Sequence, residues 1–349
     1  MTDLHNSPAA ASTLLPATCS DAPIWQVWTA AFQAPTLAIA DELGIFSELH
    51  RRPAAAADLA IRIGIDAPAT ATITGVLAAL DFVTQINGIY YLTDTSRTYL
   101  LPGGPYYWGP MLERVRSTPI NCGQLLDKLR SRSATAEGRV IAMWNAATAQ
   151  PAPLVAFTHA MHAHSFALAM RSVHALGLAG TRRVLDVGAG SGSYSIAAAL
   201  QLPEFSSVIL DMPVVCDVAL AYAAQYGVDG RIETAPGDMF EDSWPDGCDA
   251  VFLSDIFHDW DDERCRLLAA RAYDALQPGG KILVHEMPLA DTKTGPLPAT
   301  LYSMVMLFVA EGRQRSGPEI EEILSSVGFS SMTSNPTSGG YAVFSAMKI

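Results

Sequence analysis

The stretch Val184-Leu-Asp-Val-Gly-Ala-Gly-Ser-Gly192 decides the fold of this chain. Its first four residues predict a short buried strand, and glycine then occupies every second position. Glycines let the backbone approach a ligand closely, and the free N–H groups of the following helix suit a carboxylate or a phosphate. The dinucleotide fingerprint requires a glycine where Ser193 stands, and the lysine of a phosphate-binding P-loop is absent. The stretch therefore predicts a ligand-binding loop between a strand and a helix.

Short apolar segments alternate with helical patterns from Arg183 to the end of the chain. This alternation predicts an α/β fold with a Rossmann-like, doubly wound, mostly parallel sheet that carries helices on both faces. A long helix is expected before it, from Pro153 to Leu178. The predicted strands are Val184–Val187, Val208–Leu210, Ile232–Ala235, Ala250–Leu253, Lys281–His285 and Tyr341–Met347.

The first part of the chain predicts short helices followed by one hairpin, which is typical of a winged-helix module. Asp66 is the expected N-cap of one helix, and Asn87-Gly88 is a strong signal for a hairpin turn. A DNA-binding module would be basic, whereas acidic residues outnumber basic ones here, so a dimerisation role is favoured. We predict a mobile tail over residues 1–20, a mainly α dimerisation domain over 21–110, and a second domain over 111–349.

Composition and charge argue against several classes of function. The 349 residues carry a formal net charge of −13 and no basic run, so nucleic acid is not an expected partner. The five cysteines are scattered, which favours reduced thiols and a cytoplasmic location. No signal peptide is evident. The longest apolar segment, Leu301–Ala310, is too short to cross a bilayer, so we predict a buried helix and no membrane association.

Acidic residues or glycines follow five consecutive predicted strands. Ligands bind at the carboxyl ends of strands in open α/β sheets, so these residues are expected to meet at one site. Asp211 follows the second strand, where a carboxylate can accept hydrogen bonds from both hydroxyls of a ribose. After the third strand, Asp238 can accept a hydrogen bond from an adenine amino group, while Met239 and Phe240 can flank the ring. The pattern predicts a nucleotide-like ligand.

Four motifs are specific as a set: VLDVGAGSG at 184–192, LDMP at 210–213, GDMF at 237–240 and FHDW at 257–260. The segment that they span resembles class I S-adenosylmethionine-dependent methyltransferases. From about residue 20 to its end, the chain is similar to the small-molecule O-methyltransferases of the caffeate and acetylserotonin type. The resemblance implies S-adenosyl-L-methionine as the cofactor and a homodimer formed through the N-terminal domain. It also implies a small, aromatic or otherwise planar, methyl acceptor.

The resemblance extends to individual cofactor-binding residues. Phe157, Met161 and Ser165 recur every four residues, so they share one face of a predicted helix. Ser254 stands where the plant members carry a lysine that helps to hold the cofactor. The complete predicted set is Asp186, Gly188, Gly190, Gly192, Asp211, Met212, Asp238, Met239, Phe240, Ser254, Phe157, Met161 and Ser165.

His258 matches the general base of this family, and Glu286 matches a carboxylate that orients it. A hydroxyl must lose its proton as it attacks the methyl group, and a base with a pKa near neutrality suits that task. Plant members have a second glutamate beside the base, where Gln314 stands here; a glutamine can orient an imidazole but cannot neutralise its charge. The predicted acceptor-binding residues are Met143, Trp144, His162, Asp259, Tyr302, Met306, Arg313 and Gln314.

The sequence leaves alternatives open. The histidines at 159, 162 and 164 could form a metal site with His258 and His285, although the preferred prediction has no resident metal. With such a metal, the protein would be a C-methyltransferase for an α-keto acid whose carboxylate pairs with Arg313. An alternative of another class is a winged-helix regulator that binds a nucleotide-like ligand. A nicotinamide-dependent oxidoreductase conflicts with the glycine spacing.

Overall fold

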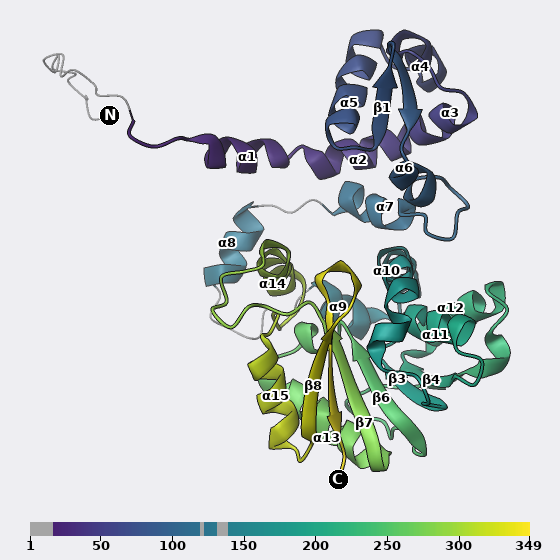
Figure 1. Ribbon diagram of the computed structural model, residues 1–349, viewed down its shortest axis with the longest axis vertical. Coiled ribbons are helices and arrows are strands. Elements are labelled where there is room, and N and C mark those ends of the chain that lie inside the picture. Colours follow the sequence, from purple (N-terminus) through teal and green to yellow (C-terminus); the bar gives the residue numbers. More distant parts are fainter. Residues whose placement is uncertain (1–16, 119–121, 131–138) are drawn as a thin grey trace, which may run out of the picture. The chain divides into compact units, whose positions relative to one another are not determined.

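The computed structural model describes residues 17–118, 122–130 and 139–349, and the chain forms two compact units (Figure 1). The first unit extends to Thr93 and the second begins at Asp94. This division lies before the predicted boundary at residue 110 because α6 (Asp94–Tyr99) and α7 (Gly109–Ser117) belong to the second unit, where α7 packs against α10 (Pro151–Ser172). The predicted mobile tail falls, up to residue 16, outside the described residues.

The first unit contains helices followed by a two-stranded hairpin, in the predicted winged-helix-like order. Its elements are α1 (Ala22–Ala30), α2 (Gln33–Glu42), α3 (Ile45–Arg51), α4 (Ala56–Ile63), α5 (Ala67–Ala79), β1 (Val83–Ile86) and β2 (Ile89–Leu92). Asp66 caps α5, because its Oδ1 accepts a hydrogen bond from the Ala69 N–H at 2.8 Å. Asn87 and Gly88 adopt φ angles of 49° and 81°, as a tight two-residue hairpin turn requires. Both predictions are confirmed.

A seven-stranded sheet forms the centre of the second unit. Its strands are β3 (Arg183–Val187), β4 (Ser206–Asp211), β5 (Ile232–Pro236), β6 (Cys248–Ser254), β7 (Leu276–Glu286), β8 (Ser330–Pro336) and β9 (Ala342–Met347). Their order is β5-β4-β3-β6-β7-β9-β8; the first five are parallel, and β9 runs antiparallel to β7 and to β8. The mostly parallel sheet is confirmed. The hydrophobic pattern does not predict β8, because this edge strand is polar and largely exposed.

Helices cover both faces of the sheet (Figure 1). On one face, α13 (Asp262–Ala275) and α15 (Gly317–Ser326) bury apolar side chains, and on the other face α10, α11 (Ser193–Gln201) and α12 (Pro213–Gln225) do so. The chain builds β4 and β5 on one side of β3 and then returns to build β6 and β7 on the other. A crevice opens at the carboxyl ends of strands at such a switch point, and there ligands bind in α/β sheets.

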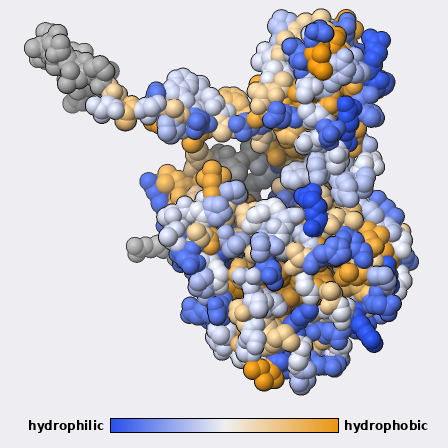
Figure 2. All heavy atoms as spheres, viewed as in Figure 1, coloured by the Kyte–Doolittle hydropathy of each residue, from blue (hydrophilic) through white to orange (hydrophobic). Residues whose placement is uncertain are grey.

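The helix α14 (Leu297–Val309) is only partly buried, which corrects the prediction of a buried helix over Leu301–Ala310. Met306 is buried, whereas Leu297 and Leu301 are 69% and 56% exposed. Its neighbour α8 (Cys122–Arg130) also exposes leucines, and Figure 2 shows apolar atoms at the surface over these two helices. Among the described helices, none combines the length and the apolar character that crossing a bilayer requires.

Candidate active site

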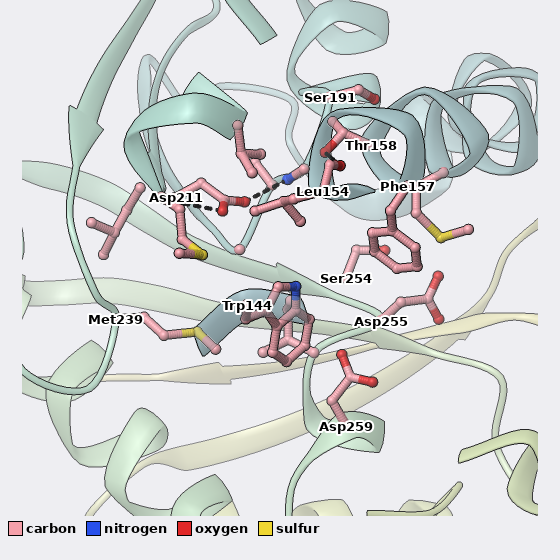
Figure 3. A pocket seen from close by; sticks show the side chains of 18 of the residues that line it. Trp144, Leu154, Phe157, Thr158, Ser191, Asp211, Met239, Ser254, Asp255 and Asp259 are labelled. Atoms are coloured by element: carbon pink, nitrogen blue, oxygen red, sulfur yellow. Dashed lines mark hydrogen bonds between the residues drawn. The ribbon is translucent and has the colours of Figure 1, made fainter. Parts of the chain in front are cut away.

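A cavity of about 1060 Å³ lies at the carboxyl ends of β3, β4 and β6 (Figure 3). Its lining comes from the loops that follow these strands and from α9 (Arg139–Ala146), α10 and α14. A volume of this size is typical of sites for small molecules. Residues that follow β3, β4, β5 and β6 therefore meet at one cavity, whereas Glu286 at the end of β7 does not line it.

The glycine loop after β3 depends on backbone conformations that favour glycine. Gly188, Gly190 and Gly192 have φ angles of 66°, 57° and 71°. A Cβ at Gly188 would overlap the side chain of Ile256. Gly188 and Gly190 line the cavity, whereas Gly192 does not; it precedes α11 and packs closely beside the β4 side chains. A Cβ at Gly192 would lie 2.7 Å from the Ile209 side chain of β4, so this glycine permits close helix–strand packing, and its contact with the cofactor stays a prediction.

Asp211 connects this loop to the end of β4. Its Oδ2 accepts a hydrogen bond from the Gly190 N–H at 2.8 Å, and its Oδ1 accepts one from the Met212 N–H at 2.7 Å. Burial raises the pKa of Asp211 to about 6, and the two backbone hydrogen bonds oppose that rise. The carboxylate lines the cavity, and each oxygen retains a lone pair for a ligand hydroxyl (Figure 3).

Asp186 lies below the loop and is almost fully buried. The Ser195 hydroxyl donates a hydrogen bond to its Oδ2 at 2.6 Å, and burial raises its pKa to about 7. Asp186 lines the cavity, as does Ser254 at the end of β6, whose hydroxyl lies 2.9 Å from Nδ1 of His285. That Asp186 and Ser254 contact the cofactor stays a prediction.

Asp238, Met239 and Phe240 line another part of the cavity. Asp238 also stabilises its own turn, because its Oδ1 accepts a hydrogen bond from the Phe240 N–H at 2.7 Å. Two residues outside the predicted set of site residues complete this wall: Trp260, the last residue of the FHDW motif, and Arg264. The ring of Trp260 packs edge-on against Phe240 at 4.8 Å, and the guanidinium of Arg264 lies 4.7 Å from the centre of the Trp260 ring.

Phe157, Met161 and Ser165 of α10 line the cavity on the shared helix face that their spacing predicts. Met212 also lines it, beside Asp211. Trp144 enters from α9, as Figure 3 shows. That these residues contact the cofactor or the acceptor stays a prediction.

His258 lies in the short 3₁₀ helix η3 (Phe257–Asp259) and lines the cavity although it is only 4% exposed. Its Nδ1 lies 3.3 Å from Oε2 of Glu286 and 3.0 Å from the amide of Gln314. Its backbone N–H donates to Oε1 of Glu286 at 3.2 Å. Glu286 therefore holds both the ring and the backbone of His258, and Nε2 is the nitrogen that is left for a ligand.

The electrostatic surroundings of His258 favour its protonated form. Burial alone lowers the pKa of this imidazole, but the carboxylates of Glu286, Asp259 and Asp255 outweigh burial and raise the pKa to about 10. Asp259 Oδ1 is 3.7 Å from Nε2, and both Asp255 and Asp259 line the cavity. Asp255 follows the predicted strand Ala250–Leu253 but is not among the predicted site residues.

Arg315 fixes the backbone of the segment that carries His258, and the sequence does not predict this role. The arginine is 3% exposed, and it donates to the carbonyl oxygens of Phe257 at 2.5 Å and Trp260 at 2.8 Å. Its guanidinium also pairs with Asp262 at 2.7 Å. Two backbone carbonyls on either side of His258 are thereby held by one buried cation.

Four predicted acceptor-binding residues lie elsewhere. Arg313 does not line the cavity and pairs with Glu319 at 3.0 Å, so it is not placed to bind a substrate carboxylate there. Met143 packs into the apolar cluster beside the cavity. Gln314 contacts His258 and does not line the cavity. Of the remaining predicted residues, Trp144, Asp259, Tyr302 and Met306 do line it.

His162, the fourth, is part of the packing behind the glycine loop. Its ring stacks on Tyr222 with centroids 3.7 Å apart, and its Nδ1 lies 3.0 Å from the Ser191 hydroxyl. Burial lowers its pKa to about 4, so the ring is neutral and supports the loop. His285 is similarly enclosed, stacked on Tyr341. In the part of the chain that the structure describes, neither histidine belongs to a group of side chains that could share a metal ion.

Gly312 provides a test of how tightly the His258 segment is packed. A Cβ at this position would overlap the carbonyl oxygens of His258 and Trp260 and would lie 2.6 Å from the Trp260 nitrogen. Backbone atoms cannot rotate away, so Gly312→Ala is expected to displace η3, lower kcat at least about tenfold and lower stability by about 1–3 kcal/mol. Thermal unfolding and steady-state kinetics measure both. Gly230→Ala is the control, because a Cβ there meets no atom within 4 Å; equal behaviour of the two variants would contradict the prediction.

Comparisons with known proteins agree with this geometry. The O-methyltransferase domain matches residues 124–330, and the O-methyltransferase dimerisation domain matches residues 25–102. The chain belongs to the O-methyltransferase family. The predicted class of enzyme and the presence of a dimerisation domain are thereby confirmed.

Relatives of this O-methyltransferase cover nearly its whole length. It is 33% identical over 315 residues to the 3-hydroxy-5-methyl-1-naphthoate 3-O-methyltransferase of Streptomyces sahachiroi, covering 86% of this chain and 87% of that protein. It is 29% identical over 319 residues to the acetylserotonin O-methyltransferase of Homo sapiens, covering 88% and 92%. The crystal structure of human N-acetylserotonin methyltransferase with S-adenosylmethionine superposes with a TM-score of 0.82 at 25% identity, covering 96% and 99%.

The family assignment settles the open alternatives in favour of O-methyl transfer. Neither C-methyl transfer to an α-keto acid nor a regulatory role is favoured by these relatives. S-adenosylmethionine is the methyl donor of the enzyme. The cavity fits this molecule, since a partly buried carboxylate with free lone pairs, Asp211, lies at the end of β4, and Met239 and Phe240 offer apolar surface for a ring.

Proposed function

We propose that this enzyme methylates a hydroxyl group of a small, planar aromatic acceptor, with His258 as the general base. The observation that carries the proposal is the arrangement of the imidazole. Nδ1 faces Glu286 and Gln314 within 3.3 Å, while the ring lines the cavity. Only Nε2 is then available to an acceptor hydroxyl.

The part of the cavity beside His258 suits a flat acceptor. Trp144 and Met306 line it with apolar side chains, and the Tyr302 ring packs edge-on against the imidazole at a centroid distance of 5.1 Å. Aromatic side chains that meet at such angles leave flat surfaces for a ring. The relatives named for a hydroxynaphthoate and for acetylserotonin act on aromatic compounds.

The proposed mechanism assigns one task to each residue at the base. S-adenosylmethionine supplies an electrophilic methyl group on a positively charged sulfur. In its neutral form, Nε2 of His258 accepts the proton of the acceptor hydroxyl as the oxygen attacks the methyl carbon. S-adenosylhomocysteine leaves with the electron pair of the S–C bond, and His258 becomes an imidazolium. Glu286 keeps the ring oriented and stabilises the imidazolium through Nδ1. The cavity walls would position the acceptor oxygen for attack on that methyl group.

The atom that receives the methyl group can be identified directly. The enzyme is incubated with [methyl-¹³C]S-adenosylmethionine and either 3-hydroxy-5-methyl-1-naphthoate or N-acetylserotonin, which are probes taken from the relatives. We expect at least one labelled product, with a carbon spectrum in which the methyl group is bonded to oxygen. Label bonded to carbon or nitrogen in the product would contradict the proposal. The variant Arg313→Ala is the control and should label the same atom, since Arg313 does not line the cavity.

The first unit is proposed to dimerise through α1, and the enzyme to reside in the cytoplasm. The helix α1 buries none of its residues within the chain, and Ile24, Trp25, Val27 and Trp28 are each more than half exposed. An apolar helix face of this kind is typical of a surface that a second copy covers. The cytoplasmic location is supported by the five free cysteines.

A further inference from the structure

Asp255 is a partly buried acid beside His258 that has no role in the mechanism above. Its Oδ1 lies 3.5 Å from Nδ1 of His258, close to the 3.3 Å separation of Glu286 from the same nitrogen. The two carboxylates approach from different segments, because Asp255 follows β6 and Glu286 ends β7. Figure 3 shows the carboxylates of Asp255 and Asp259 on the same side of the pocket. Asp255 and Glu286 therefore both face Nδ1 of His258.

The conformation of Asp255 directs its carboxylate at the base. Its φ angle is 55°, a region that few residues other than glycine adopt, although aspartate tolerates it better than most. Its N–H donates to the His285 carbonyl at 3.0 Å, and the Tyr341 hydroxyl donates to Oδ2 at 3.3 Å. The other oxygen, Oδ1, is buried without a hydrogen-bond partner and faces His258. A strained backbone that is fixed in this way is characteristic of functional sites.

The Asp255 carboxylate can balance the positive charge that His258 acquires in the reaction. When Nε2 accepts a proton, the ring gains a positive charge in a buried site, where an unbalanced charge is costly. Gln314 contacts Nδ1 but is uncharged, so the position at which the plant relatives place a second glutamate supplies no negative charge here.

We propose that Asp255 is the second carboxylate that stabilises the charged form of His258, replacing the acid that is absent at position 314. It is a positioning residue that acts through His258, and the inference rests on the proposed function because it requires His258 to be the base. Two carboxylates beside Nδ1 keep a proton on that nitrogen and leave Nε2 free to accept one. When Nδ1 carries the proton, rotating the Gln314 amide by 180° places its oxygen, in place of its nitrogen, as the acceptor for Nδ1–H.

The other groups that face His258 leave this role to Asp255. Asp259, in η3 itself, faces Nε2 and not Nδ1. Tyr302 of α14 stays neutral because burial, together with the nearby carboxylates, raises its pKa well above the usual value. His164 of α10 stays neutral because burial and the charge of His258 lower its pKa. The carboxyl groups that face Nδ1 therefore belong to Asp255 and Glu286. Burial raises the pKa of Asp255 to about 7, and the charge of His258 opposes that rise.

The titration of His258 tests the proposal without an acceptor. In the S-adenosylhomocysteine complex of the ¹³C-histidine-labelled enzyme, the His258 signal is identified by its loss in His258→Ala. We expect Asp255→Asn to lower the pKa of His258 by about 1–3 pH units, as removal of a neighbouring opposite charge does. We expect the double variant Asp255→Asn/Gln314→Glu to restore it, because the second acid is then returned at the other position beside Nδ1.

Kinetics provide the second readout. Because carboxylates hold the pKa of His258 above neutrality, kcat/KM should rise with pH as the base loses its proton. Asp255→Asn should move this rise to lower pH and lower the high-pH plateau about tenfold, since a base of lower pKa is weaker. Gln314→Glu in that background should reverse both changes. If Asp255 had a purely structural role, Asp255→Asn would lower kcat/KM at high pH without changing the pH at which kcat/KM rises.

Three results would overturn the inference: a His258 pKa that does not move in Asp255→Asn, a double variant that binds S-adenosylhomocysteine normally but does not restore the pKa, or a stoichiometric divalent metal in the enzyme that is lost in Asp255→Asn. Failure of the proposed function has a different signature. In that case His258→Ala itself keeps its turnover, whatever Asp255 does to the titration of the ring.

Discussion

Replacing His258 with alanine should lower kcat/KM about 10²–10⁴-fold while the affinity for S-adenosylmethionine stays within about threefold. The imidazole removes the proton of the acceptor, so its loss affects a step that follows cofactor binding. Its only close polar neighbours among those described are Glu286, Asp255, Asp259 and Gln314, none of which lies in the glycine loop. Steady-state kinetics and calorimetric titration of the cofactor separate the two effects.

Arg313→Ala is the matched control for this prediction. Arg313 lies one residue from Gln314, but its side chain pairs with Glu319 and does not line the cavity. Its kcat/KM should therefore remain close to that of the unaltered enzyme. If His258→Ala retained normal turnover at neutral pH, His258 would not be the base, and positioning of the acceptor alone would explain the rate.

Asp211→Ala should weaken binding of S-adenosylhomocysteine about 10–100-fold, because each lost hydrogen bond to a charged group costs about 1.5–3 kcal/mol. The carboxylate accepts from the Gly190 and Met212 amides and also faces the cavity. Its removal thus loosens the glycine loop and deletes the expected acceptor for ribose hydroxyls. Calorimetric titration measures the affinity.

The control for Asp211 is Asp217→Ala, an exposed acid on α12 that removes the same charge. Its affinity for S-adenosylhomocysteine should be unchanged. An Asp211→Ala variant that bound the ligand as tightly as Asp217→Ala would show that the carboxylate does not hold the ribose.

The sheet and its ligand-binding edge could be predicted because each strand and the residues after it are adjacent in sequence. An apolar run followed by Gly188 or Asp211 specifies both the element and what lies at its carboxyl end. The same reasoning does not detect β8, because nothing apolar distinguishes a polar edge strand from a loop.

The absence of His162 from the cavity, where the sequence prediction placed it, has a geometric explanation. Phe157, Met161 and Ser165 define the face of α10 that lines the cavity, and each successive residue is rotated by about 100° around a helix. His162 therefore follows Met161 onto a different face, where it stacks on Tyr222. Once Phe157, Met161 and Ser165 are taken as the face that lines the cavity, helical periodicity alone places His162 outside the cavity.

The roles of Asp255 and Arg315 could not be found by pattern, because they depend on tertiary contacts; the pattern of acids after strands covers the position of Asp255 but not its contact with His258. Asp255 is a single acid in a loop, and its meaning comes from a positive φ angle and from Glu286, which lies on the neighbouring strand. Arg315 meets the carbonyls of a segment more than fifty residues earlier in the chain. The sequence reveals motif residues next to strands, whereas the support of the base is assembled only on folding.

A crystal structure of the enzyme with S-adenosylhomocysteine tests the central claim most directly. We expect the ribose hydroxyls at the carboxylate of Asp211, the adenine between Met239 and the neighbouring apolar wall, and the sulfur directed at the space beside Nε2 of His258. A ligand bound elsewhere, or bound here with its sulfur turned away from His258, would contradict the account.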